Sequence, residues 1–370
     1  MRSTPRTVLA LAGAAALLVA GVTGCSSSKA SSGSGGSTAK AINNKVGILL
    51  PDTASSPRWV SADPTELKAQ CAKYKLDCTI DNANGSATTQ QSQAQAMISA
   101  GVGVILITDL DPGSGTAIQT LAKNAHVVTI DYDRLTSGGS AAYYVSFDNV
   151  KVGQDQGTAL TQCPQVAGKS AVNYVEIDGA PTDNNATLFA QGYNSVLSTQ
   201  AGWKKLADKT GNWDAATAQT VFTTMLGQNP NINAVMVAND TMAQSVINVL
   251  KAQKLNKKVA VSGQDASAGG LDNIMSGDQC FSIYKPVAGE ADVAIQVASQ
   301  ILAGQTPDAK GVTTKDPTNG REVPSFLATP TVITKANVAL PVTDGYVTAK
   351  VVCPTPALVT LCAANGITVS

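Results

Sequence analysis

Charged, amide and tryptophan side chains recur at the ends of short apolar stretches in this sequence. Asp133 and Arg134 follow one such stretch, Asn239 follows another and Asp265 a third. Carboxylates accept hydrogen bonds, arginine and lysine donate them, and an asparagine amide does both. Side chains of these types can bind a small ligand that carries several hydroxyl groups. The complete candidate set is Arg58, Trp59, Asp133, Arg134, Asn185, Trp213, Asn239, Asp265 and Lys285.

Two of the three tryptophans, Trp59 and Trp213, belong to this set. The apolar faces of a sugar ring pack on aromatic planes, and charge-assisted hydrogen bonds hold its hydroxyls. The set therefore suits a monosaccharide. A single Asp or Asn after a strand is commonly a helix cap or a turn residue, and we expect that role for Asp240. The hypothesis depends on the whole set.

Catalytic and metal chemistry find less support in the sequence. The chain has one histidine, His126, so a Ser-His-Asp arrangement or a histidine-rich metal site is not expected. Asp133, Asp183 and Asp265 could be imagined as paired acids of a glycoside hydrolase. Nearby Arg134 and Lys285 would keep such acids ionised, however, which favours binding over proton donation. We predict a binding protein without cofactor or metal, not an enzyme.

The elements that must position these residues alternate between short apolar strands and helices of 10–15 residues. This alternation predicts parallel sheets with helices on both faces. Ligands of such sheets bind beyond the carboxyl ends of the strands. Because 370 residues and about ten such units exceed one sheet, we predict an α/β fold of two doubly wound lobes. The expected strands are 46–50, 78–80, 104–107, 127–130, 143–146, 171–177, 203–208, 234–238, 258–262 and 280–284.

The N-terminus has the layout of a secretory signal peptide over residues 1–24. Arg2 and Arg6 precede an apolar stretch at 8–22 that is too short to span a membrane. A small residue before Cys25 resembles a bacterial lipobox, which implies cleavage there and lipidation of Cys25. An ordinary signal peptide with an incidental cysteine is the alternative. Residues 25–44 are rich in Ser and Gly and predict a flexible linker.

Charge and cysteine content fit an exported protein. Lys+Arg and Asp+Glu both number 26, so no net charge attracts nucleic acid. A signal peptide also stands where a sugar-responsive repressor would carry its helix-turn-helix. Six cysteines remain besides Cys25, and an even number in an exported chain suggests disulfides. Of the many possible pairings we favour the pairs close in sequence, which leaves a third: Cys71–Cys78, Cys353–Cys362 and Cys163–Cys280.

Several segments, in order, resemble the type I periplasmic sugar-binding proteins of ABC transporters, above all the members that bind D-xylose. The resemblance covers about residues 44–345. It implies that the nine candidate residues hold a monosaccharide, most simply D-xylose, for delivery to an ABC transporter permease. It also implies a monomer outside the cytoplasm, attached to the membrane by its lipid. The matching segments are Arg58-Trp59, Tyr132-Asp133-Arg134, Ser146-Phe147-Asp148-Asn149, Asp183-Asn184-Asn185-Ala186, Ala238-Asn239-Asp240, Ser262-Gly263-Gln264-Asp265-Ala266 and Tyr284-Lys285-Pro286.

The resemblance further implies a hinge of three chain crossings, near residues 147–150, 284–287 and 323–330. The N-terminal lobe would comprise 45–148 plus 286–324, and the C-terminal lobe 149–285 plus 325–345, with 346–370 as an extension. Pro57 and Ser267 depart from the family pattern and leave the exact sugar open. Glucose, arabinose or several sugars are alternatives. A nucleoside would favour more aromatic residues than the 4% present.

Overall fold

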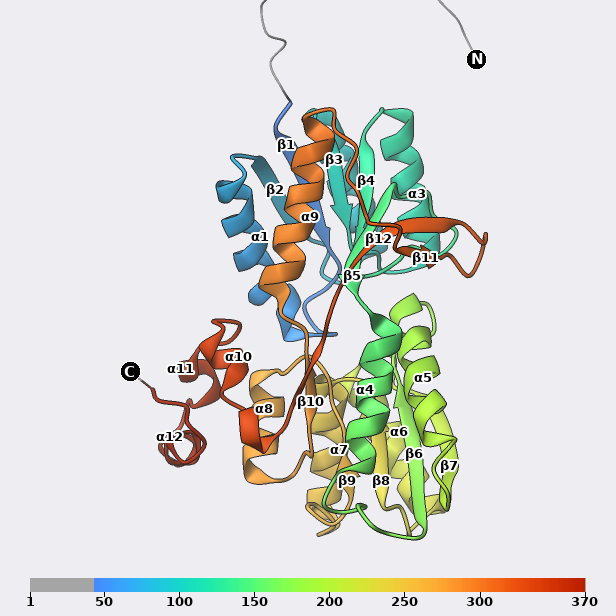
Figure 1. The fold of residues 1–370 in the computed structure, drawn as a ribbon, viewed down its shortest axis with the longest axis vertical. Helices are drawn as coiled ribbons and strands as arrows, with labels where there is room; N and C mark the ends of the chain where they lie inside the picture. The colour runs from blue at the N-terminus through green and yellow to red at the C-terminus, as the bar shows by residue number, and fades with distance from the viewer. Residues whose placement is uncertain (1–42, 370) are drawn as a thin grey trace, which may run out of the picture. The chain divides into compact units, whose positions relative to one another are not determined.

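Two parallel sheets, each covered by helices, make up the part of the chain that the structure, a computed structural model, describes (residues 43–369; Figure 1). The predicted signal peptide, Cys25 and all but the end of the predicted linker lie outside the described residues. The first sheet has seven strands in the order β11-β12-β5-β4-β3-β1-β2, and only β11 runs antiparallel to its neighbour. Their bounds are β1 Lys45–Leu50, β2 Asp77–Asn82, β3 Val104–Ile107, β4 Val128–Tyr132, β5 Tyr143–Phe147, β11 Thr313–Lys315 and β12 Glu322–Ala328.

Successive side chains along the central strands of this sheet point into two different hydrophobic cores, one on each face of the sheet. Ile48 and Leu50 of β1 pack with helices α1 (Ala62–Lys73) and α9 (Val287–Leu302). Leu49, between them, packs with α2 (Ala87–Ser99) and α3 (Pro112–Asn124) on the opposite face. Successive side chains of a strand point to opposite faces, so a strand buried on both sides reads as a continuous apolar run.

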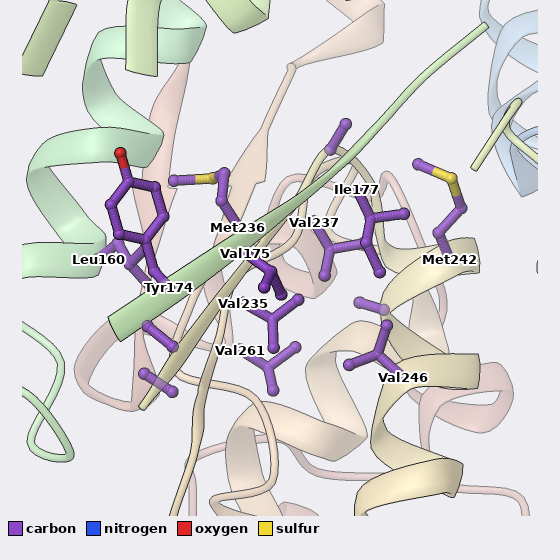
Figure 2. Close-up of a cluster of buried hydrophobic side chains, with 14 of the residues drawn as sticks. Leu160, Tyr174, Val175, Ile177, Val235, Met236, Val237, Met242, Val246 and Val261 are labelled. Atoms are coloured by element: carbon purple, nitrogen blue, oxygen red, sulfur yellow. The ribbon is translucent and has the colours of Figure 1, made fainter. Parts of the chain in front are cut away.

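The second sheet has four parallel strands in the order β7-β6-β8-β9. Figure 2 shows part of its core, in which Val175, Val235 and Val261 from neighbouring strands meet Val246 of α7. The strands are β6 Val172–Asp178, β7 Trp203–Thr210, β8 Ala234–Val237 and β9 Ala260–Val261. The helices are α4 Asn149–Thr161, α5 Asn184–Leu197, α6 Ala215–Gln228, α7 Asp240–Ala252 and α8 Ala268–Ser276.

Helices α4 and α5 approach closely because glycines face each other at their crossing. A Cβ atom on Gly153 would lie 2.1 Å from the carbonyl oxygen of Phe189, and one on Gly192 would lie 2.3 Å from that of Val150. Larger residues at either position would force the helices apart.

The chain passes between the two sheets three times. It leaves β5 for α4 at Asp148, leaves β10 (Ser282–Tyr284) for α9 through Lys285 and Pro286, and leaves β12 for β13 (Thr331–Ile333). Strands β10 and β13 pair antiparallel beside the second sheet. Strand β12 pairs with β5 as far as Ala328, which places the third crossing at residues 329–330. The two predicted doubly wound sheets are confirmed, whereas the antiparallel hairpin of β11 and β12 was not predicted.

After β13 the chain forms a helical extension that packs against α8, visible in red in Figure 1. Its apolar side chains share a core with Leu271 and Ile274 of α8. This helical segment consists of η2 (Lys335–Asn337), α10 (Leu340–Thr343), α11 (Ala349–Val352) and α12 (Pro356–Ala363), of which α11 and α12 lie in the predicted extension, residues 346–370.

Three disulfides join Cys71–Cys78, Cys163–Cys280 and Cys353–Cys362. This is the pairing that sequence spacing favours. Between residues 43 and 369, no helix combines the length and apolar character that crossing a membrane requires.

Candidate functional site

All nine predicted residues line one pocket between the two sheets. The free space that these side chains leave between them is small. Five further residues complete its lining, namely Ser55, Ser56, Asp183, Phe189 and Gln264.

Each of these residues lies in a loop at the carboxyl end of a strand or in the first two turns of the helix that follows the loop. From the first sheet, the loop after β1 carries a short 3-10 helix, η1 (Pro57–Trp59), with Arg58, and the loop after β4 carries Asp133 and Arg134. From the second sheet, the residues follow β6, β7, β8 and β9 in turn, and Lys285 follows β10 beside that sheet. The two sheets therefore present their carboxyl ends to each other, and the pocket lies between them.

Three pocket residues adopt left-handed backbone conformations, which are uncommon for residues other than glycine. Their φ angles are 62° for Asp133, 57° for Trp213 and 91° for Asp265. Such a conformation persists only where its surroundings hold it. At Asp133 the carbonyl oxygen accepts hydrogen bonds from the Tyr144 and Ser146 hydroxyls and from the Asn185 amide.

Arg58 lies inside a cage of three acidic side chains. Its Nε and Nη2 donate to the two oxygens of Asp63, each at 2.7 Å. Nη1 donates to Asp133 at 2.6 Å and Nη2 also donates to Glu290 at 2.5 Å. Burial alone would lower the pKa of Arg58, but the three acids outweigh it and hold that pKa well above its usual value. Four of the five guanidinium N–H groups are thus occupied, and one on Nη1 is left for a ligand.

Arg134 forms a second buried ion pair in the pocket lining. Its Nε lies 3.1 Å from Asp183 Oδ2, and its Nη1 donates to the Asp109 carbonyl. Both arginines lie over the Trp59 ring, Arg58 at 4.4 Å and Arg134 at 5.7 Å from the centroid. Burial raises the pKa of Asp183 although Arg134 lowers it. The ion pair with Arg134 alone would lower the pKa of Asp183, so the effects of burial and of the nearby Asp133 are the larger ones.

Direct contacts join the two sides of the pocket. Ser56 Oγ donates to Asp265 at 2.9 Å, and the Asn239 amide donates to the Ser55 carbonyl at 2.9 Å. Lys285 Nζ lies between two carboxylates, 3.7 Å from Asp133 and 3.5 Å from Asp265. The two sheets are therefore closed against each other over the pocket.

Charge in the pocket lining is balanced, with three cations and three carboxylates. Arg58, Arg134 and Lys285 face Asp133, Asp183 and Asp265. Burial opposes ionisation of Asp133, but Lys285, Arg58 and Arg134 together lower its pKa below the usual value. An uncharged ligand rich in hydroxyls matches this arrangement, because it can accept from the cations and donate to the carboxylates.

Two residues that shape the pocket were not predicted from the sequence. Phe189 follows Asn185 by one turn of α5, a spacing that places both on one helix face. Gly179 lies directly under Trp213, because a Cβ atom there would meet the ring at 1.9 Å. Only the folded chain reveals such a contact.

The expectation that Asp240 caps a helix was wrong. Asn239 is the N-cap of α7 and accepts from the Met242 amide. Asp240 is buried instead, where its carboxylate accepts from Gln279, Ser282 and the Ser267 amide. Asn239 therefore both caps a helix and contacts the opposite side of the pocket.

One group of carboxylates in residues 43–369, away from the pocket, lies close enough together to share a metal ion. It consists of Glu176, Asp178 and Asp208. The Lys205 ammonium already lies among them, 2.9 Å from Glu176 and 3.1 Å from Asp208. Lys205 therefore supplies the positive charge that a cation would bring.

Comparison with known proteins places the chain among binding proteins. The family described as periplasmic binding protein domain matches residues 46–306. The chain is 34% identical over 304 residues to the D-xylose-binding periplasmic protein of Escherichia coli K12, covering 80% of this chain and 88% of that protein. It is 31% identical to the multiple sugar-binding periplasmic receptor of Rhizobium radiobacter, covering 79% and 87%. A carbohydrate transporter solute binding protein from Chloroflexus aurantiacus, solved with D-glucose, superposes with a TM-score of 0.75 at 27% identity, covering 83% and 97%.

Proposed function

This chain belongs to the periplasmic binding protein domain family, and from that premise we propose that it binds one monosaccharide between its lobes and delivers it to an ABC importer. The observation that carries the proposal is the small pocket in which three cations, three carboxylates and two tryptophans converge. D-xylose is the proposed sugar, since that is the ligand named for the Escherichia coli relative. Glucose and other aldoses are the alternatives, because a D-glucose complex superposes on the chain.

The proposal includes an exported, membrane-attached monomer. The signal peptide at 1–24 would direct export and be cleaved before Cys25, and the lipid on Cys25 would hold the receptor on the outer face of the cytoplasmic membrane. Residues 45–148 and 286–328 would move as one lobe, and residues 149–285 and 329–345 as the other. The boundary stands at 328 because β12 pairs with β5 up to that residue. Residues 346–370 are the extension.

Calorimetry against a panel of pentoses and hexoses tests the function. We expect binding of xylose or a close relative with a dissociation constant of about 1 μM or lower. The absence of both binding heat and thermal shift with every sugar of the panel would refute the proposal. Turnover of xylosides by the purified protein would indicate an enzyme instead.

Replacing Asp265 with alanine should weaken sugar binding by more than about 2 kcal/mol, roughly thirtyfold. The change leaves the Ser56 hydroxyl without its acceptor across the pocket and removes one of the two carboxylates beside Lys285. Because residue 265 has a positive φ, Asp265→Asn, which tolerates that conformation better, separates the loss of charge from backbone strain. Asp308→Ala removes an exposed carboxylate and is the matched control. Unchanged affinity in both Asp265 variants would show that the site is misplaced.

Gly179→Ala should weaken sugar binding several-fold by displacing the Trp213 ring. The new methyl group would overlap that ring, which packs edge-on against Phe189 with centroids 6.4 Å apart. Gly227→Ala, where an added Cβ meets nothing within 4 Å, controls for the change of residue type. Titration with the sugar, followed by tryptophan fluorescence, measures both affinities. Equal affinities would remove Trp213 from the site.

A further inference from the structure

Glu290 has no place in the pocket lining, yet it holds a pocket residue. We propose that Glu290 positions Arg58 as a neutral, protonated acid, and that sugar affinity therefore falls when Glu290 loses its proton at alkaline pH. This inference rests on the proposed sugar-binding function. Glu290 lies in the first turn of α9, immediately after the second crossing, so it connects the hinge to the pocket.

The contacts of the three acids around Arg58 show which one keeps a proton. Asp63 receives two hydrogen bonds from Arg58 and a third from the Tyr132 hydroxyl. Asp133 receives one from Arg58, lies near Lys285 and is also contacted by the Asn185 amide. Glu290 receives only the bond from Arg58 Nη2. Its Oε1 is buried and has no partner among the described residues.

A buried carboxylate with so few donors is costly to ionise. Burial raises the pKa of Glu290 to about 8, with Asp133 and Asp63 adding to the rise and Arg58 and Lys285 opposing it. The charged and titratable groups that face it are Arg58 from η1, Asp63 from α1, Tyr132 and Asp133 from β4 and its end, Tyr144 from β5, Lys285 from the second crossing, and Asp308 and Lys310 across an outer groove.

The neutral form suits the pocket. Oε2 of a neutral Glu290 accepts the hydrogen bond from Arg58 without placing a second negative charge beside Asp133. Closure around a sugar excludes water and makes that extra charge harder to accommodate, so the sugar-bound form retains the proton more strongly. By linkage, affinity is greatest while Glu290 is protonated and falls as pH rises through its pKa.

Sugar affinity is measured by calorimetry at about pH 6.5 and about pH 9.5 for the native protein, E290A and E290Q. The native dissociation constant should rise at least about threefold between the two pH values. E290A, which leaves one of the two N–H groups of Arg58 Nη2 without its acceptor, should bind about tenfold more weakly at the lower pH. E290Q keeps a neutral acceptor, so it should restore most of that loss and show a flat profile.

The matched control is E176Q, which neutralises another buried carboxylate whose pKa burial also raises. Glu176 lies in β6 and binds Lys205 rather than Arg58, so E176Q should keep the native profile. The inference would be overturned if the sugar affinity of E290Q depended on pH as that of the native protein does. It would also be overturned if E290A and E290Q weakened sugar binding equally. If no sugar binds at all, the proposed function fails. Thermal melting without sugar then decides the protonation: the native protein should lose stability relative to E290Q between the two pH values, and parallel melting curves would refute a neutral Glu290.

Discussion

Replacing Arg58 with methionine is expected to lower the free energy of unfolding by about 3–5 kcal/mol and to abolish sugar binding. The guanidinium is almost completely buried and bonded to Asp63, Asp133 and Glu290. Without it, these acids remain buried with no cation among them except Lys285 near Asp133. The loss comes mainly from those unpaired acids, since methionine fills much of the space.

Denaturant unfolding at neutral and acidic pH measures this effect. The destabilisation should shrink at about pH 5, where the abandoned carboxylates take up protons more readily. Lys73→Met is the control, because its ion pair with Asp292 is exposed, with 56% and 37% of the two side chains accessible. Such pairs contribute about 0–1 kcal/mol. If the two variants were destabilised equally, the carboxylate cage would not stabilise the fold.

Removing the Cys163–Cys280 disulfide by a double change to serine should lower the free energy of unfolding by about 4–5 kcal/mol. This bond joins residues 117 apart in sequence, so it restricts the unfolded chain strongly. It also links the segment after α4 to the residues before β10, and both elements adjoin crossings between the lobes.

The matched comparison is the double serine variant of Cys71 and Cys78, which lie only 7 residues apart. Its loss in the free energy of unfolding should not exceed the roughly 3 kcal/mol expected for a disulfide that closes a 15-residue loop. Thermal melting of both variants, with the native protein as reference, gives the two losses. Equal losses, or a larger one for the short loop, would contradict the expected dependence on loop length.

The apolar runs and helix signals predicted most of the fold. Residues 87–99 form one of the helices expected between the strands, and its N-cap Ser86 accepts from the Thr89 amide. Strand β3 is buried along its whole length and reads as an uninterrupted apolar run. The hairpin of β11 and β12 was missed because its sequence is mixed and polar, with Pro324 inside a strand. Proline usually argues against a strand, and here the pairing with β5 outweighs that preference.

The pocket residues could be predicted because their position after strands is visible in the sequence. The residues that hold these side chains in place could not be predicted in this way. Glu290 in the first turn of a helix looks like an ordinary acid that favours the helix dipole. Its contact with Arg58 joins segments far apart in the chain. Likewise, nothing near Gly179 in sequence announces that Trp213 will cover it. Such roles depend on tertiary contacts, which a local pattern does not contain.

The strand order of the first sheet also constrains how the molecule reaches its native state. Strand β5 has β4 on one side and β12 on the other, and the whole second sheet lies between β5 and β12 in the chain. The first sheet therefore cannot be completed until nearly all of the polypeptide is present. Long-range pairing of this kind slows folding, so we expect the first sheet to form more slowly than a sheet of the same size whose neighbouring strands are consecutive in the chain.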